Sequence, residues 1–356
     1  MTIFDLVTSQ GLASYWTELS QDRDPYPCEE LFPNDKKRGL NLKWLKGSKG
    51  LPVVLKTSAF DVAAVPRPRI GFEKLSADMP YFKESKYIDE EMRQELNMVM
   101  ESGIQGYIDA VMDKIFDDQT ELLEAAAATR ERMRMMALTT GVVSMTSNGQ
   151  AFTFDYGVEH KGDAATAWSN LSTADPLEDI RVAKEKIQDE TGTVVTRGMC
   201  DQKVWRNLRN NEKIKKDIFV LTQGVGAITD KQLHQYIVDQ LEIDIRVNSK
   251  RYKDEKGNVT PYMPADTLVL FPDGALGKTW FGTTPAESDL MSASAANVSI
   301  VDTGVSITSV KKEDPVQVET IVAMICLPDF PMADQVYIMD TEPARSAEGS
   351  KQNGNH

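Results

Sequence analysis

The feature that most constrains this chain is a run of fifty residues without proline, 89–138, in which apolar side chains recur every three or four positions. This spacing predicts an amphipathic helix with one buried face and one acidic face. Unbroken, the helix would be about 75 Å long, whereas a compact ball of this chain length is only roughly 50 Å across. We therefore expect an elongated molecule, and elongated subunits usually assemble. The apolar positions are Met92, Leu96, Val99, Met100, Ile104, Tyr107, Ile108, Val111, Ile115, Leu122 and Ala126.

Two glycines interrupt this predicted helix. Gly103 and Gly106 each cost about 1 kcal/mol relative to alanine inside a helix, so we expect a bend or a break there. The remaining piece, residues 107–138, would still span about 48 Å.

The charge of the chain changes sign at the start of this region. Residues 36–74 carry ten Lys and Arg against two acids, a local charge of +8, and residues 84–131 carry thirteen acids against four bases, a local charge of −9. Pro52, Pro66 and Pro68 favour extended backbone in the basic part. We predict strands over 51–57 and 69–75, so that residues 40–80 form a long hairpin or open loop.

Shorter elements surround these two regions. Residues 1–35 read as an arm that packs on something else, and Asn148-Gly149 predicts a hairpin within 142–156. Helices are predicted after the caps Asp175, Asp201 and Thr229, with Pro176 at the first helical position. Strands over 193–200, 242–248 and 267–271 complete a mixed α/β domain. After Pro285 the chain is strand-rich, at 298–301, 305–310, 316–327 and 335–339, and these strands are expected to return to the sheet that the 142–156 hairpin begins.

Composition excludes several classes of protein. The net charge of −14 argues against a sequence-independent grip on nucleic acid, which needs an excess of Lys and Arg. No apolar stretch reaches the length of a membrane span, and the first residues lack the regions of a secretory signal, so we expect no membrane association. Cys28, Cys200 and Cys326 are too far apart for a metal cluster and predict isolated reduced thiols.

Catalytic patterns are missing from the sequence. His160 and His234 stand at neither ligand nor triad spacing, and His356 is terminal. The Gly224-Val225-Gly226 triplet lacks the later glycine and lysine of a phosphate loop and predicts a surface turn. We therefore predict no enzyme activity and no catalytic, cofactor-binding or metal-binding residues.

The order of elements resembles one family of structural proteins. The landmarks are Leu122-Leu123-Glu124 through Thr139-Thr140-Gly141, then Ser147-Asn148-Gly149-Gln150-Ala151-Phe152, Ala167-Trp168-Ser169, Asp175-Pro176-Leu177-Glu178-Asp179-Ile180 and Met263-Pro264-Ala265-Asp266-Thr267-Leu268-Val269-Leu270, followed by Gly277. Over roughly residues 30–340 they resemble the phage major capsid protein E family, the lambda-type branch of the Hong Kong 97-type capsid fold. Order and spacing carry this resemblance more than any single motif.

The resemblance implies an α+β subunit in four parts. These are an N-terminal arm (1–38), an extended loop (39–88), a peripheral domain with a long spine helix (89–160 and 281–340) and an axial domain (161–280), followed by a disordered tail (341–356). It also implies hexamers and pentamers of an icosahedral phage head, which enclose double-stranded DNA without binding it specifically. The resemblance further implies that such subunits are made in the host cytoplasm and end in the virion capsid. Their partners are a portal and in some cases a decoration protein. A separate scaffolding protein is also expected, since no long helical extension precedes the arm.

Two hypotheses join the resemblance to the charges. The basic loop of one subunit is expected to lie along the acidic helix of the next, and Gly103 and Gly106 are expected to let the spine helix bend when the shell expands. In the first hypothesis Lys43, Lys46, Lys56, Arg67 and Arg69 face Glu91, Glu95, Asp113, Asp117 and Glu121.

Three other functions remain open at this stage. A nanocompartment shell with the same fold would enclose enzymes in place of DNA. An α/β enzyme using residues 161–280 would need a pocket with convergent polar groups, and a host-surface or tail-associated binding module would form an assembly of different size and symmetry.

Overall fold

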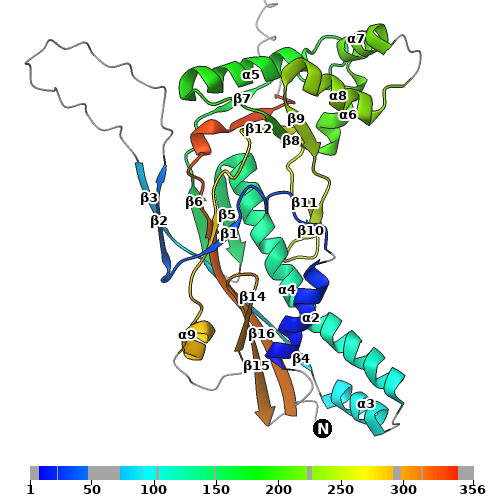
Figure 1. The fold of residues 1–356 in the computed structure, drawn as a ribbon, viewed down its shortest axis with the longest axis vertical. Helices are drawn as coiled ribbons and strands as arrows, with labels where there is room; N and C mark the ends of the chain where they lie inside the picture. The colour runs from blue at the N-terminus through cyan, green and yellow to red at the C-terminus, as the bar shows by residue number, and fades with distance from the viewer. Residues whose placement is uncertain are drawn as a thin grey trace, which may run out of the picture.

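The computed structural model describes residues 8–21, 23–46, 73–88, 90–101, 104–147, 150–222, 227–291, 298–313 and 316–343. The molecule is elongated, with one sheet at each end of its long axis and a long helix beside them (Figure 1). The described part of the chain has two apolar cores: the larger extends from a six-stranded sheet along the long helix to a five-stranded sheet, and the smaller lies between the five-stranded sheet and its helices. Among the described residues, no helix is both long enough and apolar enough to cross a membrane.

The first sheet has six strands. Its order is β1 (Asn34–Lys36), β13 (Thr279–Phe281), β16 (Val316–Pro328), β15 (Val305–Glu313) and β14 (Val298–Val301), and β4 (Tyr81–Ile88) also pairs with β16. The helix α9 (Pro285–Met291) precedes β14. Our expectation that these late strands join the 142–156 hairpin is wrong. That hairpin forms at the predicted turn, with β5 (Val142–Ser147) against β6 (Gln150–Asp155), but it is a two-stranded sheet of its own.

The second sheet has five strands and carries four helices. Its order is β7 (Lys161–Asp163), β17 (Tyr337–Asp340), β12 (Thr267–Phe271), β8 (Arg197–Cys200) and β9 (Asp244–Val247). The helices are α5 (Pro176–Thr191), α6 (Gln202–Asn210), α7 (Glu212–Thr222) and α8 (Asp230–Leu241). The predicted caps are confirmed, because Asp175, Asp201 and Thr229 each accept a bond from a backbone amide of the helix that follows. The helix α7 was not predicted.

The C-terminal end corrects two of our predicted boundaries. Strand β17, expected in the peripheral domain, pairs with β7 and β12 in the five-stranded sheet. Thr341, expected to begin a disordered tail, is fully buried, and both its backbone amide and its hydroxyl donate to the carbonyl oxygen of Asp266. Residues 344–356 lie outside the described residues.

The predicted fifty-residue helix is two helices, α3 (Glu90–Glu101) and α4 (Gln105–Thr140). The interruption includes Ile104, whose backbone is extended, so the helical bonds cannot continue through it. Gly103 lies outside the described residues, and Gly106 is in the first turn of α4. The predicted apolar stripe is buried only towards the end of α4. Ile115, Leu122 and Ala126 are buried, whereas the side chains of Ile104 and Tyr107 are 59% and 65% exposed.

The N-terminal residues belong to the chain's own core, which corrects the expectation of an arm packed on something else. The helix α2 (Ser9–Gln21), which was not predicted, packs on β14 and α4. Cys28, Leu31 and Phe32 are fully buried, and β1 pairs in parallel with β13. Short apolar runs such as this one give no sign in the sequence of the partner that covers them.

The predicted long hairpin is present at its base. Strand β2 (Asn41–Lys46) pairs antiparallel with β3 (Glu73–Asp78). The predicted strand 51–57 lies outside the described residues, as do residues 69–72 of the strand predicted over 69–75. A second hairpin, β10 (Arg251–Lys253) with β11 (Val259–Pro261), extends from the five-stranded sheet towards α4 (Figure 1). A short 3₁₀ turn (Ala333–Gln335) precedes β17.

Candidate assembly surface and buried charge cluster

Only part of the predicted basic set can be placed. Lys43 is in β2, where its side chain is exposed, and Lys46 is the last residue of the same strand. Lys56, Arg67 and Arg69 lie outside the described residues. Whether this set reaches a neighbouring subunit stays a prediction.

The predicted acidic set lies on the two helices α3 and α4. Glu91 and Glu95 are in α3, and Asp113, Asp117 and Glu121 are exposed on α4. Two of these acids already have partners within the same chain. Asp117 accepts a 2.6 Å hydrogen bond from the hydroxyl of Tyr15, which raises the pKa of Tyr15 to about 12, and Glu121 accepts a 2.6 Å bond from Lys86. The other side of that lysine is held by Asp118 at 2.8 Å.

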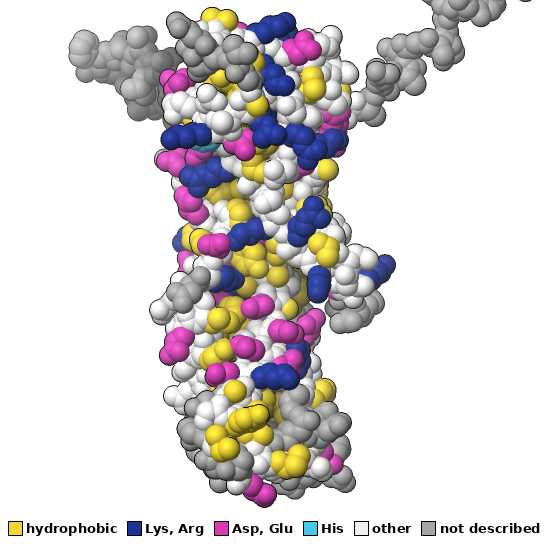
Figure 2. All heavy atoms as spheres, turned by 90° about the vertical axis from the view of Figure 1, so that its right-hand side faces the viewer, with side chains coloured by type: hydrophobic (Ala, Val, Ile, Leu, Met, Phe, Trp, Pro, Cys, Tyr) yellow, Lys and Arg dark blue, Asp and Glu magenta, His cyan; other side chains and the backbone are white. Residues whose placement is uncertain are grey.

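The face that carries α3 and the first half of α4 differs in charge between its two halves. Lys and Arg side chains, interspersed with Asp and Glu, lie over its upper half, whereas Asp and Glu side chains predominate over the lower half, where these helices project from the body (Figures 1 and 2). Met98 on α3, Tyr107 on α4 and Ile104 between the two helices are exposed. We call Met98, Ile104, Tyr107, Asp113, Asp117 and Glu121 the projecting surface.

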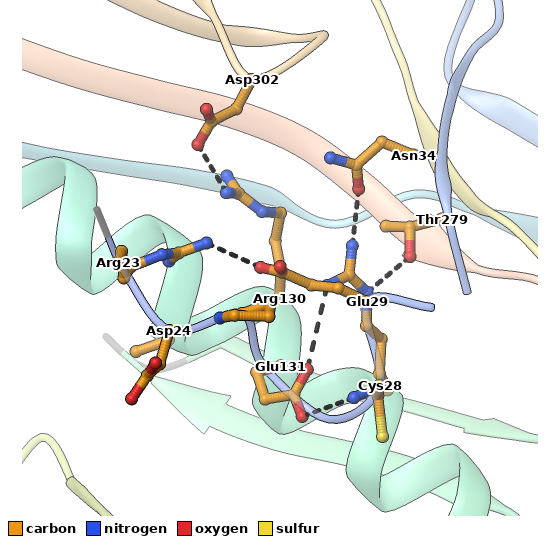
Figure 3. A network of polar contacts seen from close by, with 12 residues as sticks. Arg23, Asp24, Cys28, Glu29, Asn34, Arg130, Glu131, Thr279 and Asp302 are labelled. Atoms are coloured by element: carbon orange, nitrogen blue, oxygen red, sulfur yellow. Dashed lines mark hydrogen bonds and ion pairs between the residues drawn. The ribbon is translucent and has the colours of Figure 1, made fainter. Parts of the chain in front are cut away.

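The second half of α4 carries three charged side chains that are almost completely buried, Arg130, Glu131 and Arg134. Arg134 donates through Nε to Oγ1 of Thr279 at 2.8 Å and through Nη2 to Oδ1 of Asn34 at 2.5 Å (Figure 3). The backbone amide of Cys28 donates to Oε1 of Glu131 at 3.1 Å. The helix is thereby joined to the N-terminal segment and to β13 through polar contacts inside the core.

Arg130 extends this cluster to the turn between β14 and β15. Its Nη2 lies 2.7 Å from Oδ2 of Asp302 (Figure 3). Oδ1 of the same carboxylate accepts a 3.1 Å bond from the indole of Trp16. Asp302 and Thr303 both have positive φ, 47° and 75°. A turn that most residues adopt only with strain is held here by two side chains from distant elements.

Glu131 is the least satisfied member of the cluster. Its carboxylate is 0% exposed, its Oε2 accepts no hydrogen bond, and Nη1 of Arg134 is 3.8 Å away. Burial raises the pKa of Glu131 to about 7, because a carboxylate removed from water is costly when ionised. Burial also raises the pKa of the Cys28 thiol, which is neutral.

The β10–β11 hairpin contacts both α4 and residues 24–26 from the outside of the core. Lys250 donates to the carbonyl oxygens of Asp24 and Pro25 at 3.2 and 2.9 Å, and its ammonium group lies 5.0 Å from the ring centre of Tyr26. On the helix side, Arg132 lies over the ring of Tyr252 at 5.3 Å. The hairpin therefore connects the five-stranded sheet with α4 and with residues 24–26.

The spacing of residues in the sequence does indicate this cluster of buried charges. Continued at four-residue spacing from Leu122 and Ala126, the apolar stripe reaches Arg130 and Arg134. Charged residues that fall on the buried face of a helix must have buried partners. The partners themselves, Asn34, Thr279 and Asp302, are too distant in sequence to be predicted.

His234 lies in a shallow groove beside α8, where it contacts the carboxylate of Asp244. Nε2 of His234 lies 2.8 Å from Oδ1 of Asp244, and Nε of Arg246 binds the other oxygen at 3.1 Å. The carboxylate is thus shared between two surface side chains and points at no third reactive group. Within the described ranges, no cluster of three or more His, Cys, Asp and Glu residues could hold a metal.

Comparison with known proteins decides the family. The model of the phage major capsid protein E family matches residues 12–339, which is nearly the whole chain. The chain belongs to the phage major capsid protein E family. No match is found among curated proteins.

Solved structures show the fold of this capsid protein. A protein from E. coli CFT073, provisionally described as a prophage capsid protein, matches with a TM-score of 0.60 and 15% identity over 94% of this chain and 99% of that one. A phage-related protein from Bordetella bronchiseptica RB50 matches with a TM-score of 0.55 and 14% identity over 95% and 98%. The capsid of cyanophage A-1(L) matches with a TM-score of 0.50 and 13% identity over 88% and 91%.

These comparisons confirm the predicted α+β Hong Kong 97-type capsid fold. The protein is a structural component of a phage capsid and therefore of the virion. Its family is one of shell proteins and not of enzymes. The projecting surface and the buried charge cluster are accordingly parts of a subunit built to contact copies of itself.

Proposed function

We propose that this capsid protein assembles into the hexamers and pentamers of an icosahedral head that encloses double-stranded DNA. The observation that carries the proposal is the family match over residues 12–339. The elongated fold supports it, because a long subunit with two apolar cores along its length offers extended flanks to its neighbours. A net charge of −14 suits a container whose contents must not adhere to its wall.

The proposed contact between neighbours joins the basic loop to the projecting surface. Lys43 and the other bases of residues 36–74 would lie along α3 and α4 of the next subunit. Each exposed ion pair contributes only about 0–1 kcal/mol, so the charges mainly set the register and the rate of encounter. The exposed Ile104 and Tyr107 would supply apolar burial to the same contact.

The four-part division of the subunit is part of the same proposal, with β17 moved to the axial part. Before assembly the subunit would reside in the host cytoplasm. A separate scaffolding protein and a portal would direct closure of the shell, and a decoration protein would bind in those relatives that use one.

Electron microscopy and sedimentation of the purified full chain test this function. We expect closed shells, or rings of five and six, when the chain is mixed with its scaffolding protein at low salt. Nucleic acid inside particles from infected cells separates a phage head from a nanocompartment shell, which would contain protein cargo. A monomer under every condition, including with scaffold, would contradict the proposal.

A further inference from the structure

The N-terminal segment 23–34 shares an apolar core with α4 and is also held by polar contacts. The polar contacts with buried side chains of the helix are the bond from the Cys28 amide to Glu131 and the bond from Arg134 to Asn34. Between these contacts, Cys28, Leu31 and Phe32 are fully buried. When the segment packs on α4 it therefore encloses the carboxyl group of Glu131.

The charges around Glu131 do not compensate its burial. On α4 itself, Arg134 directs its short hydrogen bonds to the neutral groups of Asn34 and Thr279, and Arg130 is paired with Asp302. From segment 23–34, Arg23 is paired with Glu29 at 2.7 Å, and Glu29 raises the pKa of Glu131 further. From the other side, Tyr262 is a buried neutral phenol whose pKa is raised by burial. Arg134 also lowers the pKa of Glu131, but its ion pair with that carboxyl group is a long one of 3.8 Å, and the effect of burial is larger.

A neutral carboxyl group fits this site better than a carboxylate. Oε1 of Glu131 needs only to accept from the Cys28 amide, which either form can do. Among the described residues Oε2 has no donor at hydrogen-bond distance, and Nη1 of Arg134 is 3.8 Å away, so an ionised group would keep a buried negative oxygen that accepts no hydrogen bond. If segment 23–34 leaves the helix, water reaches the carboxyl group and this cost is removed.

We propose that the packing of segment 23–34 on α4 is coupled to the uptake of one proton by Glu131. The packed state holds the proton, and release of the segment lets the proton go. Because Lys250 at the base of the β10–β11 hairpin also donates to this segment, its release removes these contacts of the hairpin, while the contact of Arg132 with Tyr252 still joins the hairpin to α4. Proton concentration thereby sets how firmly segment 23–34 is held between the hairpin and the helix.

The sign of the effect follows from the two states. The carboxyl group titrates near its ordinary value of 4.5 when the segment is released and near about 7 when the segment is packed. Below the lower value both states are protonated, and packing is strongest. Between the two values the released state alone loses the proton, so release becomes about tenfold easier per pH unit. Above about 7 both states are ionised, and the effect levels off.

Hydrogen exchange of the full chain measures this coupling. Amide exchange of a peptide covering residues 26–34 is followed by mass spectrometry at pH 5, 6, 7 and 8, and each rate is divided by the intrinsic chemical rate at that pH. We expect the opening ratio to rise about fortyfold from pH 5 to pH 7 and only about twofold from pH 7 to pH 8. Strand β12, buried in the other sheet, serves as the internal reference.

Two variants assign the effect to its residue. Glu131→Gln keeps an acceptor for the Cys28 amide but cannot titrate, so its opening ratio should be the same at every pH. Glu124→Gln removes an exposed acid from the same helix and should keep the wild-type profile. An opening ratio in the wild type that is independent of pH, or a Glu131→Gln profile equal to that of the wild type, overturns the proposal. If Glu131→Gln does not fold, the wild-type profile alone decides.

Discussion

Arg130 in α4 and Asp302 in the turn between β14 and β15 form an ion pair of 2.7 Å across 172 residues of sequence. The guanidinium group is only 3% exposed, and the carboxylate also accepts from Trp16 in α2. Three elements of the subunit therefore meet at one carboxylate. Removal of that carboxylate would leave a buried cation without a partner.

Replacement Asp302→Ala should destabilise the subunit by about 3 kcal/mol, since breaking a buried ion pair from one side costs this order of energy. The loss of the bond from Trp16 should also loosen α2. The midpoint of urea unfolding and the near-ultraviolet signal of Trp16 report the two effects. Asp302→Asn is the matched variant, because asparagine tolerates positive φ and still accepts one bond. An equal loss of stability in both variants would assign the stabilisation to the charge, whereas wild-type stability of Asp302→Asn would mean that the charge is unimportant.

Thr303→Gly should stabilise the subunit by about 1 kcal/mol. Thr303 is exposed and has φ 75°, a conformation that is unfavourable for a β-branched residue and accessible to glycine. The gain is partly offset by the greater freedom of glycine in the unfolded chain. Thermal unfolding beside the wild type measures the difference. A lower unfolding midpoint would show that Thr303 is not strained, because the contacts of Asp302 already hold residue 303 at positive φ.

Reversal of two bases in the extended loop, Arg67→Glu with Arg69→Glu, should impair assembly and leave the subunit folded. The acids of α3 and α4 would then repel the loop, and the defect should shrink at high salt. Sedimentation at about 50 mM and about 500 mM salt, roughly a tenfold difference in ionic strength, measures the assembly defect and its salt dependence. Lys216→Glu with Lys231→Glu makes the same charge change on α7 and α8. Normal shells from the loop variant would remove the basis of the proposed contact.

Alanine at both Gly103 and Gly106 should stiffen the junction of α3 and α4. Each alanine favours helix by about 1 kcal/mol, and among the described residues no neighbouring atom lies within 4 Å of a Cβ added at Gly106. We expect subunits that assemble but form shells that expand slowly or not at all, as judged from particle diameters by electron microscopy. Ala110→Gly, at an exposed position of α4, should have the opposite effect. Unchanged expansion in the double variant would assign the bend elsewhere.

Features set by neighbouring residues were predictable from the sequence. The caps Asp175 and Thr229 lie where their helices begin, and Asn148-Gly149 separates two strands that pair. In each case a short-range rule of backbone geometry decides the structure. The family could also be predicted, because the order of such elements along the chain is itself distinctive.

Features set by distant residues were not predictable. The pairing of β17 with β7 and the burial of Cys28 depend on which surfaces meet in three dimensions. The helix α7 was missed because Asn211, which caps it by accepting from the amides of Lys213 and Ile214, is also where the predicted preceding helix ends. Acids on α4 were all read as exposed, although Glu131 faces the core, because charge alone does not show which side of a helix is covered.

The parallel pairing of β1 with β13 has a consequence for the time at which a subunit becomes usable. Asn34 aligns with Thr279, so the first strand must wait until almost the whole chain has been synthesised before its partner exists. Contacts of such long sequence separation form late in folding. A nascent chain on the ribosome would therefore lack the finished core beneath α4. Only a chain whose translation is complete could then join a shell, whether or not a protein partner is present.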